Sequence, residues 1–228
     1  GYFYANTYKP EQRPKFIMEA LAYHEAVPGH HLQIAIMQEQ QDMPDFRRHE
    51  GSTAFIEGWA LYAEQLSKEM GYYRDDFSEY GRLALEIWRA VRLVVDTGLH
   101  YYKWTRDEAI EYCMQNSGEG EHEIEVEVDR YIAMPGQALA YKIGELRILE
   151  LREKAKKALE EWRVHLDAND ADYDHHIIEG LWLYQSLDLT HEAYLQRALD
   201  LESGPARAAA PRLSRYGHVV VSEPVGVG

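Results

Sequence analysis

Residues 23–33 read YHEAVPGHHLQ, a stretch that sets three histidines and a glutamate around a Pro-Gly pair. The common zinc-binding helix carries the pattern HExxH, in which two histidines four positions apart share the metal. Here the fourth position after His24 is Pro28, and the next histidines are His30 and His31, six and seven positions on. The stretch therefore predicts a metal-binding helix that is interrupted between its histidines.

The spacing of these histidines excludes a regular helix. Six residues rise about 9 Å and turn by about 240°, so His24 and His30 could not share an ion on a straight helix. Seven residues bring His31 back to the same face, but at a rise of about 10.5 Å. The Pro28-Gly29 pair removes a backbone donor and permits unusual dihedral angles. Two residues looped out after Ala26 would restore the spacing, which leaves His30 and His31 both open as the second ligand.

A third ligand is predicted in STAFIEGWALYAEQL, residues 52–66. Glu57 lies in a stretch that is apolar on almost every side, where an unpaired carboxylate would be costly to bury. A metal ion would neutralise this carboxylate, and a catalytic zinc needs three protein ligands and one open position. The alternative is a glutamate that reaches solvent or pairs with an arginine.

Composition limits the classes of partner. The 228 residues include 46% hydrophobic and 12% aromatic residues, as in a folded chain, and the formal charge is −15. Such a charge repels nucleic acid and anionic membrane surfaces, so we expect neither as a partner. The single cysteine, Cys113, cannot form an intrachain disulfide and leaves the cellular compartment open. The first residues show neither Met nor a signal-peptide layout, so we expect a fragment or a processed product.

The hydrophobic pattern is helical throughout, and the predicted fold class is all-α. Thr105, followed three residues on by Glu108, predicts a capping box at a helix start. The acidic run 119–129 alternates in a way that would also suit a strand, but we favour helix or loop. Residues 42–51 are predicted as a loop. The predicted helices cover residues 16–41 with a break, 53–69, 77–103, 105–116, a long segment after 136, 175–187 and 190–201.

Four segments together resemble a bacterial family catalogued as domain of unknown function 885. They are HEAVPGHHLQ, FIEGWALYAEQL, DTGLHYYKWTRDEAIEYC and EVDRYIAMPGQALAYKIG. That family is similar to the helical zinc peptidases, such as thimet-type oligopeptidases and helical zinc carboxypeptidases, in which HExGH and a downstream glutamate bind zinc. The resemblance covers roughly residues 1–158 and corresponds to the C-terminal portion of the family.

The resemblance implies a zinc-dependent peptidase that acts on a peptide substrate. His24, His30 and Glu57 would hold Zn²⁺, and Glu25 would be the general base that activates a water molecule. Two alternative interpretations stay open. The first is a non-catalytic helical scaffold or truncated pseudo-peptidase. The second is a zinc hydrolase of a non-peptide amide or ester.

Four further residues are candidates from the same resemblance. Tyr141 or His100 would stabilise the oxyanion, while Arg130 or Tyr131 would bind the substrate carboxylate or backbone. The alternative for each is structural, since a tyrosine in a chain with seventeen of them is often part of the core.

The expected organisation has three parts. Residues 1–158 form the zincin-like catalytic segment, residues 159–215 resemble HEAT-like helical repeats, and residues 216–228 form a disordered tail. One or two repeat units cannot bury their apolar faces without a neighbour. The segment 159–215 is therefore a candidate surface for a protein partner.

Overall fold

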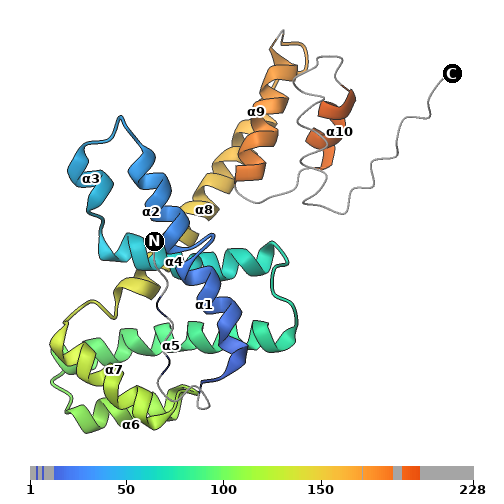
Figure 1. Ribbon diagram of the computed structural model, residues 1–228. Helices are drawn as coiled ribbons and strands as arrows, with labels where there is room; N and C mark the ends of the chain where they lie inside the picture. Colours follow the sequence, from blue (N-terminus) through green and yellow to red (C-terminus); the bar gives the residue numbers. More distant parts are fainter. Residues whose placement is uncertain (1–3, 5–6, 8–12, 171, 187–191, 201–228) are drawn as a thin grey trace. The chain divides into compact units, whose positions relative to one another are not determined.

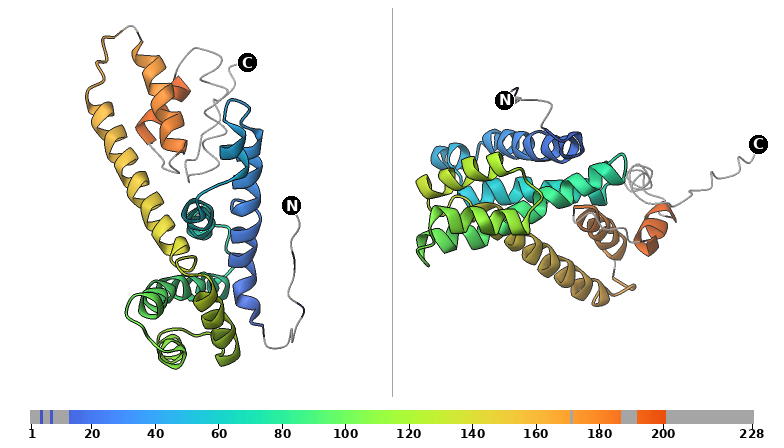
Figure 2. Two further views of the ribbon diagram at one scale, coloured as in Figure 1. Left: turned by 90° about the vertical axis from the view of Figure 1, so that its left-hand side faces the viewer. Right: turned by 90° about the horizontal axis from the view of Figure 1, so that it is seen from below.

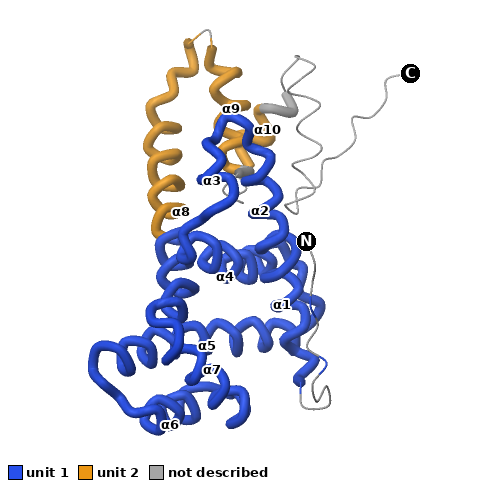
Figure 3. The backbone as a smooth tube through the Cα atoms, turned by 60° about the vertical axis from the view of Figure 1, so that its left-hand side comes forward, with its two compact units in different colours: residues 1–149 blue, residues 150–228 orange. Residues whose placement is uncertain are grey.

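Helices supply all the regular structure in the described part of the chain, which is residues 4, 7, 13–170, 172–186 and 192–200 of a computed structural model (Figure 1). This confirms the predicted all-α class. The chain divides into two compact units, residues 1–149 and 150–228 (Figure 3). None of the helices within the described ranges is both long and apolar enough to span a membrane.

The first predicted helix is indeed divided at the Pro-Gly pair. A short 3₁₀ turn, η2 (Lys15–Ile17), leads into α1 (Met18–Glu25), and α2 (His30–Glu39) follows the break. The predicted loop over residues 42–51 is wrong in one detail, because it contains the one-turn helix α3 (Asp45–His49). Pro44 precedes this turn and Asp45 opens it, an arrangement that favours a helix start.

Two long helices form the frame on which α1 lies (Figure 1). Helix α4 (Thr53–Glu69) has the predicted bounds, and α5 (Asp76–His100) ends three residues before the predicted end. The side chain of Asp75 caps α5 by accepting a hydrogen bond from the Ser78 amide. Because α1 packs against both helices, the residues at its C-terminal end are held beside α4.

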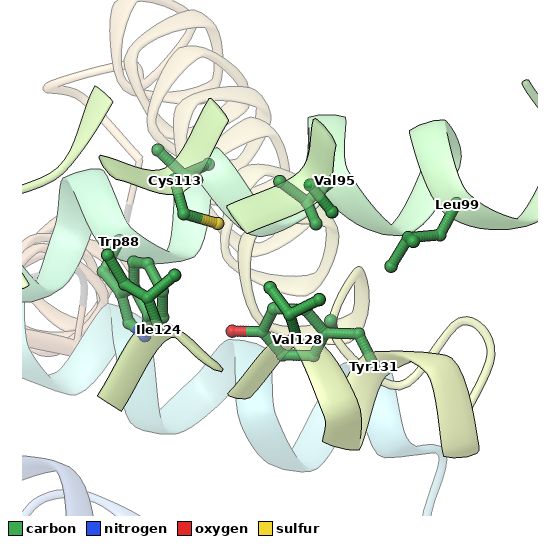
Figure 4. Packing of buried hydrophobic residues seen from close by; sticks show 10 residues of the cluster. Trp88, Val95, Leu99, Cys113, Ile124, Val128 and Tyr131 are labelled. Carbon is green, nitrogen blue, oxygen red and sulfur yellow. The ribbon is translucent and has the colours of Figure 1, made fainter. Parts of the chain in front are cut away.

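The next two helices complete the core of the first unit. Helix α6 (Arg106–Asn116) begins with the predicted capping box of Thr105 and Glu108. The acidic run belongs to α7 (Glu121–Ala133) and is a helix, not a strand. Its apolar residues recur at helical spacing and are buried against α5 and α6 (Figure 4), in a cluster formed by Trp88, Val91, Val95, Leu99, Ala109, Cys113, Ile124, Val128, Tyr131 and Ala138.

Helix α8 (Ala140–Val164) begins in the first unit and crosses α4 where two glycines meet. A Cβ on Gly58 would lie 2.4 Å from the Cα of Gly144, and a Cβ on Gly144 would lie 1.8 Å from the carbonyl oxygen of Ala54. Only glycines permit so close an approach. The crossing places the start of α8 beside the Glu57 segment.

The second unit contains the later part of α8 with α9 (Tyr173–Ser186) and α10 (Glu192–Asp200), and α9 and α10 lie side by side (Figure 2). These two helices confirm the short helical patterns predicted at 175–187 and 190–201. The unit has a separate apolar core, formed by Leu159, Ile177, Leu181, Tyr184, Tyr194 and Leu195. The rest of the predicted repeat segment, residues 201–215, and the predicted tail, 216–228, lie outside the described residues.

Candidate metal centre

The break between α1 and α2 shifts the helical register by two residues. The amide of Ala26 donates to the carbonyl of Ala22 over 2.8 Å, the normal spacing of four. The amide of Leu32 then donates to the carbonyl of Ala26 over 3.3 Å, a spacing of six. Two residues are therefore looped out, as the sequence predicted, and His30 opens the new helix.

Two hydrogen bonds connect this region to α4, the helix that carries Glu57. The indole Nε1 of Trp59 donates to the carbonyl oxygen of Pro28 over 2.8 Å. The amide Nε2 of Gln33 donates to the carbonyl oxygen of Phe55 over 3.1 Å. The first bond holds the looped residue Pro28 against α4, and the second holds α2 against the same helix.

Gly29 is the point of closest backbone approach within the break. A Cβ added at this position would lie 1.9 Å from the carbonyl oxygen of His24 and 2.3 Å from that of Tyr23. Backbone atoms cannot give way as a flexible side chain can, so this approach requires glycine.

The two histidines and Glu57 converge. One ligand atom from each of His24, His30 and Glu57 lies within 4.8 Å of the other two. The Glu57 Oε2 atom is 3.7 Å from His24 Nε2 and 3.3 Å from His30 Nε2. Ligands on a tetrahedral zinc stand roughly 3.3 Å apart, given bonds of about 2.0–2.1 Å. Two imidazoles and one carboxylate are the donor set of a catalytic zinc with an open position, so these residues fit the metal.

The structure separates the two candidates for the second histidine ligand. The ring of His30 meets that of His24 edge to face, with centroids 4.8 Å apart. His31, the next residue, is exposed and is absent from the cluster. The two-residue insertion thus places His30, and not His31, beside His24 and Glu57.

Electrostatics at the cluster favour an ionised carboxylate. Burial alone would raise the pKa of Glu57, but hydrogen bonding to His24 and His30 outweighs it and lowers that pKa to about 2. Burial tends to lower the pKa of His24, yet hydrogen bonds to Glu57 and Glu64 leave it raised. Glu57 therefore carries a negative charge that a cation would meet, whereas the raised pKa of His24 favours a protonated ring that would have to lose its proton to bind a metal.

Glu64, which the sequence pattern alone did not single out, is 1% exposed. Its Oε1 atom lies 2.7 Å from Nδ1 of His24 and 3.4 Å from an Nη of Arg89. The available signal was its spacing, because Glu64 follows Glu57 by seven residues and so occupies the same face of α4.

Gln137, also overlooked, connects Glu57 to Tyr141. Its Nε2 lies 3.4 Å from Glu57 Oε1 and donates to the Tyr141 hydroxyl over 3.2 Å. Its Oε1 accepts a hydrogen bond of 2.6 Å from Arg130. The Tyr141 ring stacks at 6.3 Å from the ring of His24, so this candidate lies beside the cluster.

The candidates Arg130 and Tyr131 belong to a hydrogen-bonded network. Arg130 is half-buried and also pairs with Glu127. Tyr131 is 1% exposed, and its hydroxyl donates to Glu127 and accepts from the buried Arg92, at 2.9 and 2.8 Å. The guanidinium of Arg92 lies 4.7 Å from the centroid of the Tyr141 ring. Tyr131 thus offers no surface to a ligand, whereas Arg130 borders the residue that orients Tyr141.

The remaining candidates are His100 and Glu25. The Nε2 of His100 is hydrogen-bonded to the Tyr131 carbonyl over 2.9 Å. On α5, His100 lies about 12 Å farther along the helix than Arg92. The structure does not bring this ring into the cluster with His24. Glu25 is the last residue of α1, is exposed, and makes no hydrogen bond or ion pair with any residue that the structure describes.

Comparisons with known proteins agree with this arrangement of helices. No curated protein matches the chain. The crystal structure of "the putative lipoprotein from Colwellia psychrerythraea" is similar, with 43% sequence identity and a TM-score of 0.65. The match covers 80% of this chain and 32% of that chain, so this chain spans about a third of that relative.

The family comparison covers most of the chain. Residues 1–168 match the family described as "Bacterial protein of unknown function (DUF885)", a range that includes every candidate site residue. On this match, the chain belongs to the bacterial DUF885 family of unknown function.

Proposed function

We propose that this chain carries the metal centre of a zinc-dependent peptidase. The observation that supports the proposal is the convergence of His24, His30 and Glu57, whose ligand atoms lie within 4.8 Å of one another across the broken helix. A helix break that costs regular hydrogen bonds and still unites three ligands is difficult to explain by packing alone. The resemblance to helical zinc peptidases, which share this ligand order, supports the same proposal.

The proposed chemistry is water-mediated hydrolysis. When bound, zinc supplies a Lewis acid for the substrate carbonyl and activates a water molecule near neutral pH. Glu25, exposed beside His24, accepts a proton from the water and passes it to the leaving amine. Its carboxylate is suited to this task because no described residue pairs with it.

Tyr141 is the proposed donor to the oxyanion. Because its hydroxyl accepts a hydrogen bond from Gln137, its own proton is available for a substrate oxygen. Preorganised donors of this kind stabilise the charge that develops on the carbonyl oxygen. His100 is the weaker candidate, since its Nε2 is bonded to Tyr131.

The other parts of the proposal concern the rest of the molecule. The α9–α10 pair, with its own apolar core, is consistent with a HEAT-like segment that binds a protein partner.

Elemental analysis of the purified chain tests the metal site. We expect zinc in the wild type and in Glu25→Gln, and its loss in His30→Ala. His31→Ala is the matched control, because it removes an adjacent, exposed imidazole and should retain zinc. Equal zinc in His30→Ala and His31→Ala would remove His30 from the ligand set.

A substrate panel tests the reaction. Cleavage of peptides by the wild type, and not by Glu25→Gln at equal zinc content, is the expected result. Turnover of small amides or esters alone would redirect the proposal to a non-peptide substrate. Zinc without turnover of any substrate would favour a scaffold or pseudo-peptidase.

A further inference from the structure

Glu64 is a carboxylate in the interior of the first unit, behind the proposed metal site. Only 1% of the residue is exposed, and its Oε2 atom has no hydrogen-bond partner among the residues described. A buried charge is tolerated only when other groups compensate it. The carboxylate contacts His24 and Arg89, in both cases through Oε1.

The His24 ring lies between two glutamates of α4. Its Nδ1 is 2.7 Å from Glu64, while its Nε2 is 3.7 Å from Glu57. A hydrogen bond at Nδ1 fixes both the rotation of the ring and the nitrogen that carries the proton, so that Nε2 is left as the ligand atom. The seven-residue spacing of the glutamates places one on each side of the imidazole.

Arg89 supplies the compensating charge. The residue is 6% exposed, and it reaches Glu64 with one Nη at 3.4 Å. Its other Nη donates to the carbonyl of Leu85 over 3.1 Å, which anchors the guanidinium to α5. The same guanidinium lies 5.9 Å from the centroid of the Tyr141 ring. Arg89 thus joins α5 to the rear of the site on α4.

We propose that Glu64 is the positioning residue of His24, and that Arg89 is the counter-ion that keeps Glu64 in place. The Glu64–Arg89 pair holds the imidazole with Nε2 directed toward Glu57 before a metal arrives. The part of this inference that concerns zinc rests on the proposed function. The orientation of the His24 ring does not depend on it.

Zinc affinity, measured by competition with a chromophoric chelator, tests the inference. Glu64→Leu alone would leave Arg89 as an uncompensated buried charge and could fail to fold. The informative variant is the double substitution Glu64→Leu/Arg89→Met, which replaces both charges with apolar groups of similar size. Such replacements of buried ion pairs are often neutral for stability.

The double variant should fold and bind zinc about 10- to 100-fold more weakly than the wild type, the usual effect of removing an outer partner of a histidine ligand. Glu64→Gln should lose less, because its amide oxygen still accepts a hydrogen bond from Nδ1. Glu69→Gln, an exposed change on the same helix, is the matched control and should bind zinc as the wild type does. A folded double variant with wild-type zinc affinity would overturn the inference and leave the pair a purely structural role.

A second readout works without metal. Nitrogen NMR of His24 in the metal-free chain, at alkaline pH where the ring is neutral, reports which nitrogen carries the proton. The wild type should hold it on Nδ1, and the double variant should show a mixture of both forms. If the wild type bound no zinc, the proposed function would fail, while this spectrum would still decide whether Glu64 orients the ring.

Discussion

The indole nitrogen of Trp59 donates a hydrogen bond of 2.8 Å to the carbonyl oxygen of Pro28, so α4 holds the looped-out residues between His24 and His30. Trp59 lies two residues after Glu57 on the same helix. The helix that contributes the carboxylate therefore also fixes the segment that sets the histidine spacing.

Trp59→Phe keeps an aromatic ring and removes only this donor. We expect the free energy of unfolding to fall by about 1 kcal/mol, the net value of one hydrogen bond, and zinc affinity to fall with it. Urea titration and chelator competition measure the two effects. Trp182→Phe makes the same chemical change in the second unit and should leave zinc affinity unchanged. Unchanged affinity in both variants would show that Trp59 does not hold the break.

Gly29→Ala should abolish the metal site. The added Cβ would lie 1.9 Å from the His24 carbonyl oxygen, and the resulting shift of backbone would separate the histidines. Zinc content and circular dichroism of the purified variant report the outcome. Gly118→Ala is the control, since a Cβ at that glycine would meet nothing within 4 Å. A Gly29→Ala chain with full zinc content would contradict the close approach.

Gln137→Leu removes the amide that joins Glu57, Tyr141 and Arg130. We expect zinc to be retained at reduced affinity and peptide turnover to fall by about tenfold or more, because the Tyr141 hydroxyl loses its orientation. Steady-state kinetics at saturating zinc separate the two effects.

Gln115→Leu serves as the matched control for Gln137→Leu. Gln115 is an exposed glutamine on α6 whose amide is bonded to Glu111. Equal turnover in the two variants would exclude Gln137 from orienting the site.

The single thiol should be unreactive in the folded chain. Burial raises the pKa of Cys113 from 9.0 to about 11, and the thiolate is the reactive form. A disulfide reagent should therefore react slowly at neutral pH and faster as pH rises toward 11, provided that the fold persists. The same chain in denaturant should react at once. Fast labelling of the native chain at neutral pH would show that the α5–α6–α7 core opens.

Local patterns in the sequence predicted the helices because the forces involved are local. Thr105 and Glu108 cap α6 through groups three residues apart, so both could be read together. The Pro28-Gly29 break was predictable because proline and glycine act on their own backbone. The short helix at Asp45 was missed because a single turn has too few residues to show a period.

The ligand residues could be proposed from type and spacing, but their surroundings could not. Glu64 meets Arg89 only because α4 packs on α5, and Gln137 meets Glu57 only because Gly58 and Gly144 let α8 approach α4. Contacts between distant segments depend on crossing geometry, which no single helical pattern contains. The same limit applies to Tyr131, whose sequence position suggested a ligand contact although its side chain lies in the core.

The six-residue hydrogen-bonded step from Ala26 to Leu32 has a consequence for recognising such proteins by pattern. A search keyed to two histidines four positions apart passes over this chain, although its ring nitrogens converge with Glu57. Such a search should require that the two imidazoles face the same point. The number of residues between them can vary when an indole from a neighbouring helix holds the looped-out residues in place. Chains with other separations between the two histidines become candidates once the query includes a tryptophan two positions after the glutamate.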